Sequence, residues 1–251
     1  MRAELEGKVI LVSGGTGHLG KNLISCLLQA GAVVINMSSA KINEEEIESN
    51  PTNLSQFAVE LSDENEVMKV LQSLPESLKI DGILNLAARS PRGISLDLTA
   101  DEFLDVFASV LLPTWNVIRI FHSRLRNGAS IVNLGSLWGI VSPNPHMYLD
   151  LGNEPAVPLP AAKAAVMQLS SYLAVLFADR GIRVNNLVPG WFPANRGKPR
   201  PDYVEGIVAK VPLGRIGKPQ DLNSAVLFML NDGSNYMTGQ SIVIDGGYSL
   251  W

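Results

Sequence analysis

A short apolar run, a glycine-rich turn and a helical pattern open the chain, and this order constrains the fold more than any other feature. The apolar run Lys8–Val12 is followed by the turn Ser13–Gly20. The turn contains the spacing G-x-G-x-x-G at Gly15, Gly17 and Gly20. Glycine suits such a turn because it adopts positive φ and lets a ligand approach the backbone closely. The sequence therefore predicts a βα unit whose helix N-terminus faces the phosphates of a dinucleotide.

Apolar runs and helical patterns alternate along the rest of the chain. The predicted strands are Lys8–Val12, Ala32–Met37, Gln56–Leu61, Gly82–Ala87, Ser130–Leu134, Arg183–Leu187 and Ser241–Ile244. The predicted helices are Asn22–Gln29, Glu64–Leu74, Ala100–Arg124, Ala161–Asp179 and Gln220–Asn231. Apolar strands separated by helices are typical of a parallel sheet that is buried on both faces. We therefore predict one α/β domain over residues 1–251, a Rossmann-like doubly wound parallel sheet of about seven strands with helices on both faces. The polar, proline-rich stretches Ser142–Pro160 and Pro189–Asp202 are predicted loops at the carboxyl edge of the sheet, where ligands bind.

Composition narrows the classes of function. Because 46% of the 251 residues are hydrophobic and 18% are charged, the chain can bury a large core. A net charge of −4 argues against a nucleic-acid partner. The single cysteine, Cys26, indicates a reducing compartment, so we expect a cytoplasmic protein. The sequence predicts no membrane span, no signal-peptide core and no metal site.

Six further segments carry a pattern that extends over nearly the whole chain. They are Ile10–Gly14, Glu60–Asp63, Leu84–Ala88, Val132–Ser136, Arg183–Gly190 and Thr238–Gly247. Their order resembles the single-domain branch of the short-chain dehydrogenase/reductase family. The resemblance implies an oxidoreductase that moves a hydride between NAD or NADP and a carbonyl or alcohol substrate. It also implies a homodimer or homotetramer.

The resemblance assigns cofactor-binding positions. These are Gly14, Gly15, Thr16, Gly17, His18, Leu19, Gly20, Ser38, Ser39, Glu60, Leu61, Asn85, Ala87, Lys163, Pro189 and Gly190. His18 stands where the family has its central glycine. The second predicted strand ends without the acidic residue that favours NAD and without the arginine that favours NADP. We favour NAD slightly, since the run Glu44–Glu46 would repel a 2′-phosphate if it lay close.

The catalytic positions depart from the family pattern. Ser136 and Lys163 match the catalytic serine and lysine, but Leu159 stands four residues before the lysine, where the family has its tyrosine. Leu159 has no proton to give. Val110 occupies the position of the asparagine that supports the lysine in the family. Tyr148, between Ser136 and Lys163 in the sequence, is one alternative proton source, and water is another. The protein is therefore either an active oxidoreductase or a catalytically silent nucleotide-binding protein that acts as a sensor or partner subunit.

The loop Trp191–Tyr203 lies over the substrate in the family that this chain resembles. It contains Arg196, Lys198 and Arg200, together with the aromatic residues Trp191 and Phe192. Cationic and aromatic side chains together predict a small-molecule substrate that is anionic, phosphate-bearing or linked to a sugar. The alternative is that these residues form a solvated lid.

Overall fold

A computed structural model describes residues 4–43, 45, 47, 51–88, 96–144, 157–193 and 201–251. Seven strands form one parallel sheet in the order β3-β2-β1-β4-β5-β6-β7. They are β1 (Val9–Ser13), β2 (Val33–Ser38), β3 (Leu54–Ala58), β4 (Ile80–Asn85), β5 (Leu125–Leu134), β6 (Arg183–Pro189) and β7 (Ser241–Ile244). The chain starts at the centre of the sheet, builds outward to β3 and then crosses over to β4, which confirms the predicted doubly wound topology.

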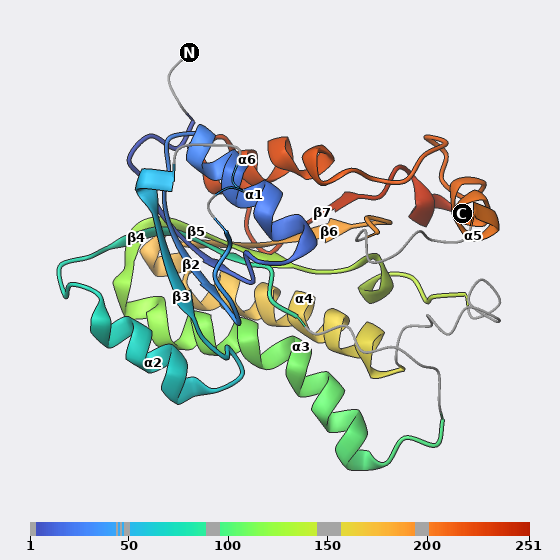
Figure 1. Ribbon diagram of the computed structural model, residues 1–251, viewed down its shortest axis with the longest axis horizontal. Helices are drawn as coiled ribbons and strands as arrows, with labels where there is room; N and C mark the ends of the chain where they lie inside the picture. The colour runs from blue at the N-terminus through green and yellow to red at the C-terminus, as the bar shows by residue number, and fades with distance from the viewer. Residues whose placement is uncertain are drawn as a thin grey trace.

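Helices cover both faces of the sheet. They are α1 (His18–Gln29), α2 (Glu64–Ser73), α3 (Ala100–Phe121), α4 (Pro158–Leu176), α5 (Pro201–Val208) and α6 (Asn223–Leu230). Figure 1 shows α1 and α6 on one side of the sheet and α2, α3 and α4 on the other. Two buried apolar clusters match these layers, one between the sheet and α2, α3 and α4, the other beneath α1 and α6.

Local signals explain where the helices begin. Thr99 accepts a hydrogen bond from the N–H of Glu102, whose carboxylate in turn accepts from the N–H of Thr99 at 2.8 Å, so a capping box starts α3. Asp63 caps α2 by accepting from the N–H of Asn65 at 2.8 Å. Pro158 begins α4, a position at which proline needs no backbone N–H.

The structure differs from the sequence analysis at the third strand and at one helix. The third strand was predicted to run to Leu61, but β3 ends at Ala58. The chain then turns into α2, because the carbonyl of Glu60 accepts a hydrogen bond from the N–H of Asp63 at 3.0 Å. The sequence analysis also missed α5, whose eight residues follow a proline-rich stretch and include a glycine.

A row of polar side chains crosses the centre of the sheet. Ser13, Asn85, Asn133 and Asn186 face one another in register on β1, β4, β5 and β6. The Ser13 hydroxyl donates to Asn85 at 3.0 Å, Asn85 donates to Asn133 at 2.8 Å, and Ser170 of α4 links Asn133 to Asn186. Because all these groups are buried and hydrogen-bonded, they hold the carboxyl ends of the strands in fixed register.

Two helices meet the length and composition of a membrane span. They are the segment Ala100–Arg124, which contains α3, and α4. Both lie against the sheet in the same layer, and Val117, Phe121 and Leu173 from them are buried in the core. The core of the domain therefore accounts for their apolar character, whereas their outer surfaces remain partly exposed.

Candidate functional site

The turn between β1 and α1 has the shape of a phosphate cradle. Gly14 has a φ of 79°, which favours glycine, and its N–H donates to the carbonyl of Met37 at 2.8 Å. A Cβ atom on Gly20 would lie 2.6 Å from the carbonyl oxygens of Gly14 and Gly15. Helix α1 starts directly after this turn, so its first N–H groups point toward any ligand seated there. The residues present are therefore compatible with the pyrophosphate of a dinucleotide.

Two polar residues of β2 accept hydrogen bonds from the backbone of the glycine turn. The side-chain oxygen of Asn36 accepts from the N–H of Gly15 at 3.2 Å and from the hydroxyl of Ser38 at 3.1 Å. The N–H of Thr16 donates to the same Ser38 hydroxyl at 3.3 Å. Both β2 side chains are buried, whereas Ser39 is exposed. The sequence analysis missed Asn36, although an asparagine within an otherwise apolar strand is the signal that could have revealed it.

A cleft of about 340 Å³ opens at the carboxyl ends of the strands. Of the predicted site residues, it is lined by Gly14, Gly17, His18, Leu19, Gly20, Ser136, Lys163, Pro189 and Gly190. Its lining also includes Leu86, Ala88, Leu134, Gly135, Trp138, Leu159 and Phe192, most of which the sequence analysis did not assign to the site. The structure thus brings the glycine turn and the predicted serine and lysine into one cavity.

Other predicted cofactor residues lie outside the lining of this cleft. Asn85 is buried in the polar row between Ser13 and Asn133. Leu61 is also buried, and its carbonyl accepts from the side-chain amide of Asn116 at 3.1 Å. The others outside the lining are Gly15, Thr16, Ser38, Ser39, Glu60 and Ala87. Their assignment to the cofactor stays a prediction, and Tyr148 lies outside the described residues.

Lys163 projects from α4 into a buried position beside the end of β5. Its side chain is 8% exposed, and its Nζ donates to the carbonyl of Leu134 at 2.8 Å. Burial lowers the pKa of Lys163 to about 8, because the charged ammonium loses its hydration. Ser136 follows β5 and caps the short turn Leu137–Gly139, where its hydroxyl accepts from the N–H of Trp138 at 3.2 Å. In the part of the chain that the structure describes, no acceptor takes the hydroxyl hydrogen of Ser136, so it can donate to a ligand oxygen.

An apolar cluster forms the wall next to Lys163. Leu159 and Val110 are 3% and 1% exposed, and they are buried together with Ala162 and Val166. Trp138, on the short turn after Ser136, packs against the same cluster. The two positions at which the family resemblance predicts a phenol and an amide therefore contribute no polar group to this part of the cleft.

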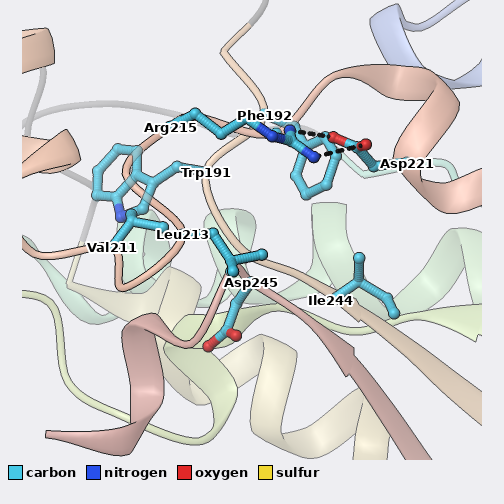
Figure 2. Close-up of a pocket in the computed structure, with 10 residues that line it drawn as sticks. Trp191, Phe192, Val211, Leu213, Arg215, Asp221, Ile244 and Asp245 are labelled. Carbon is cyan, nitrogen blue, oxygen red and sulfur yellow. Dashed lines mark hydrogen bonds and ion pairs between the residues drawn. The ribbon is translucent and has the colours of Figure 1, made fainter.

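A second cavity, of about 240 Å³, lies beyond Phe192, which lines both cavities (Figure 2). Its other described lining residues are Trp191, Val211, Leu213, Arg215, Gly217, Asp221, Ile244, Asp245 and Gly246. Arg215 binds Asp221 through two hydrogen bonds of 2.6 and 2.9 Å, drawn in Figure 2. The Asp245 carboxylate accepts two backbone hydrogen bonds of 2.8 Å each, from Gly247 and Ser249. The three charged side chains are thus hydrogen-bonded within the protein, and the rest of the described wall is largely apolar.

Aromatic side chains connect the surroundings of the two cavities. The Trp191 ring lies edge-on to Trp138 at 5.9 Å and to Tyr248 at 6.3 Å. Trp191 and Phe192 were predicted to lie over the substrate, and they stand at the carboxyl end of β6 next to the cleft. Arg196, Lys198 and Arg200 lie outside the described residues, so their predicted contact with an anionic substrate stays a prediction.

The sheet order, the glycine turn and the cleft at the carboxyl edge define a dinucleotide-binding α/β protein of the Rossmann-like class. A family model described as enoyl-(acyl carrier protein) reductase matches residues 19–249. The 3-oxoacyl-[acyl-carrier-protein] reductase FabG of Thermotoga maritima is 30% identical over 97% of this chain and 98% of its own. The chain therefore belongs to the short-chain dehydrogenase/reductase family, as the order of motifs predicted.

Solved structures agree with this assignment. One is a short chain dehydrogenase from Leptospira borgpetersenii that was solved with bound NAD+. It has a TM-score of 0.86 at 27% identity, and the match covers 98% of this chain and 94% of that chain. The RhlG protein of Pseudomonas aeruginosa, solved as an active-site complex with NADP, has a TM-score of 0.82 at 26% identity, with 98% of each chain covered.

Proposed function

We propose that this protein is an NAD(P)-dependent oxidoreductase that transfers a hydride to or from a small carbonyl or alcohol substrate. The observation that carries the proposal is a single cleft that contains the glycine turn, Ser136 and Lys163. Family membership and relatives solved with NAD+ or NADP support it further. When bound, the nicotinamide supplies or accepts the hydride.

Each part of the cleft has a distinct role in this proposal. The glycine turn and the start of α1 bind the pyrophosphate through backbone N–H groups. Lys163 holds the ribose next to the nicotinamide, and Ser136 donates a hydrogen bond to the substrate oxygen. Such a donor stabilises the negative charge that develops on the oxygen as a carbonyl is reduced.

The end of β2 favours NAD slightly over NADP. Ser39 is exposed after β2, while the Ser38 hydroxyl is occupied by the N–H of Thr16. The described residues just after this strand place one cation, Lys41, in an exposed position. A site for the 2′-phosphate of NADP more often presents an arginine.

The substrate in this proposal is a small molecule with an anionic or sugar-linked part. The cationic segment between Trp191 and Tyr203 supports this substrate class, as does the aromatic group around Trp191. We also propose a homodimer or homotetramer in the cytoplasm. The outer surfaces of α3 and α4 expose Leu104, Tyr172 and Val175 at 58%, 67% and 79%, which is unusual unless another subunit covers them.

A second candidate is a catalytically silent nucleotide-binding protein. The observation that favours it is that Leu159, one turn before Lys163, is buried in one apolar cluster with Val110 and supplies no phenol there. Both candidates retain the glycine turn and predict that a nicotinamide dinucleotide binds. They differ in whether a bound cofactor is turned over.

Fluorescence titration with NADH and NADPH tests the proposal, since Trp138 lines the cleft and reports its occupancy. Turnover is then measured with a panel of aldehydes, ketones and a 3-oxoacyl thioester. Binding of either cofactor together with turnover supports the oxidoreductase. Binding without turnover of any carbonyl supports the silent protein, and absence of binding by both cofactors contradicts both.

A further inference from the structure

Two titratable side chains line the described part of the cleft, and they are His18 and Lys163. His18 begins α1 at the glycine turn, which follows β1. Lys163 bonds to Leu134 at the end of β5, and β4 separates β1 from β5 in the sheet. Lys163 is therefore the titratable group next to Ser136, where the substrate oxygen is expected.

The wall that α4 contributes to the cleft excludes a hydroxyl relay from this helix. Leu159 lies one helical turn before Lys163 and occupies the face that a phenol would need. Its burial with Val110 and Ala162 fixes an apolar side chain there. The described residues of this wall therefore contain no tyrosine that passes a proton between the ammonium and the substrate.

The hydrogen bonding of Lys163 leaves it able to donate. An ammonium carries three N–H donors, and one of them is directed to the carbonyl of Leu134 at 2.8 Å. The described residues take up neither of the other two donors, which are enough for one contact to a ribose hydroxyl and one to a substrate oxygen. The bond to Leu134 also holds the Nζ atom at the end of β5, on the same strand end that leads into Ser136.

The electrostatic surroundings favour release of a proton. Burial lowers the pKa of Lys163 to about 8, and a general acid is most effective when its pKa lies near the working pH. Its surroundings include Leu134 at the end of β5 and, in the cleft lining, Trp138 and Leu159. Val110 of α3 lies in the apolar cluster to which Leu159 belongs. Among the described residues no carboxylate forms an ion pair with it, and His18 is the other titratable group of the cleft lining.

We propose that Lys163 itself gives the proton to the substrate oxygen during carbonyl reduction, which rests on the proposed oxidoreductase function. The carbonyl carbon receives the hydride and its electron pair, and the π pair of the C=O bond moves to oxygen. An N–H bond of the ammonium breaks as the new O–H bond forms, which leaves a neutral amine. The amine regains a proton from water, so each carbonyl reduced consumes one proton. In the oxidative direction the neutral amine takes the proton of the alcohol.

The Lys163→Arg variant separates proton transfer from charge. Arginine keeps a cation and N–H donors at this position but does not release a proton near neutral pH. We expect NADH to remain bound while carbonyl reduction falls about a hundredfold, the range typical of a lost general acid. Lys69→Arg on α2, an exposed lysine outside the cleft, is the matched control and should keep wild-type turnover.

A second measurement does not depend on turnover. Reductive methylation with ¹³C-formaldehyde labels reachable amines, and the NMR signal that is absent from Lys163→Arg belongs to Lys163. We expect this signal to titrate near pH 8 and to be protected by NADH. In the wild-type protein, kcat/KM for reduction should fall as the pH rises above this value, tenfold per unit.

Several results would overturn the inference. One is a Lys163→Arg variant that keeps more than a tenth of wild-type turnover. Another is a Lys163 amine that resists labelling or titrates near its ordinary value of 10.5. A hundredfold loss in Tyr148→Phe would assign the proton to Tyr148 instead. A wild-type protein that binds NADH and reduces no carbonyl of the panel would overturn the proposed oxidoreductase function and, with it, this inference. Turnover that survives in Lys163→Arg overturns the inference alone.

Discussion

Leu159 of α4 and Val110 of α3 are buried in one apolar cluster, and Leu159 lines the same cleft as Lys163, one helical turn before it. The resemblance to the short-chain dehydrogenase/reductase family predicts a phenol and an amide that serve the reaction at these two positions. Here both have become part of the packing between two helices, and Ala162 and Val166 complete the cluster. Both side chains are apolar and belong to one cluster, and Leu159 presents an apolar surface to the cleft.

Replacing Leu159 by tyrosine should raise the rate of carbonyl reduction at least tenfold, since the phenol would stand one turn before Lys163 on the same helix face. The larger side chain has to fit a buried position, so a loss of about 1–3 kcal/mol in stability is expected. Turnover with NADH and the carbonyl panel measures the gain. Leu159→Phe is the matched control, because it adds the ring without the hydroxyl. Equal rates for the two variants would show that the missing phenol does not limit the reaction.

Lys163 should make stability depend on pH in a defined direction. Its pKa is lowered to about 8 in the folded protein from an ordinary value of 10.5. Between these pH values the unfolded chain binds a proton that the folded protein does not, so the free energy of unfolding rises with pH. The gain approaches roughly 3 kcal/mol across the window and is absent below pH 8.

Denaturant unfolding of wild-type protein and Lys163→Met at pH 7 and pH 10 measures this effect. Other groups titrate in both proteins and cancel in the difference. We expect the free energy of unfolding of the wild type to increase relative to that of Lys163→Met as the pH rises. A difference that stays constant between the two pH values would show that Lys163 is not desolvated in solution.

Much of the fold could be predicted because its signals are local and repeated. Strand β7 lies where the run Ser241–Ile244 predicts it, and α2 begins at Glu64 directly after the cap residue Asp63. The end of the third strand depends on a tertiary contact as well as on the local turn into α2. The third strand ends early because the segment around Leu61 leaves the sheet, and its carbonyl meets the side chain of Asn116 from α3. That contact joins residues far apart in sequence, and no local pattern encodes it.

Part of the candidate site was also predictable because its signals are local in the sequence. Glycine spacing identified the turn, and motif order located Ser136 and Lys163, which the structure places in one cleft. The supporting role of Asn36 and the shared wall at Phe192 depend on how β2 and the end of β6 lie against other segments. Burial of Lys163 and its lowered pKa likewise depend on packing around α4.

Gly20→Ala should weaken binding of NADH at least tenfold and lower stability by about 1–3 kcal/mol. The added Cβ would lie 2.6 Å from the carbonyl oxygens of Gly14 and Gly15, so the turn has to move. Fluorescence titration and thermal unfolding measure the two effects. Gly206→Ala is the control, since nothing lies within 4 Å of the added atom there and alanine favours the helix. Unchanged binding in Gly20→Ala would place the cofactor away from the turn.

Ser39→Arg should tighten NADPH binding about tenfold and leave NADH binding nearly unchanged. Ser39 is exposed at the end of β2, where an arginine can pair with a 2′-phosphate. Parallel titrations of wild type, Ser39→Arg and the control Ser39→Ala with both nucleotides measure the preference. If NADPH binds Ser39→Arg and Ser39→Ala equally, the 2′-position of the ribose does not lie at the end of β2.

Val175→Glu should convert the proposed homo-oligomer into smaller species. Val175 is 79% exposed on α4, next to Leu176 at 59%, and a buried carboxylate in a subunit contact is costly. Sedimentation velocity at micromolar concentration compares the variant with wild type. Met68→Glu on α2 is the control, because it adds the same charge at an exposed apolar residue outside α3 and α4. A wild-type protein that sediments as a monomer contradicts the proposed assembly. An oligomer unaffected by Val175→Glu would instead place the contact between subunits on another surface. A subunit contact would then not explain why α4 exposes apolar side chains.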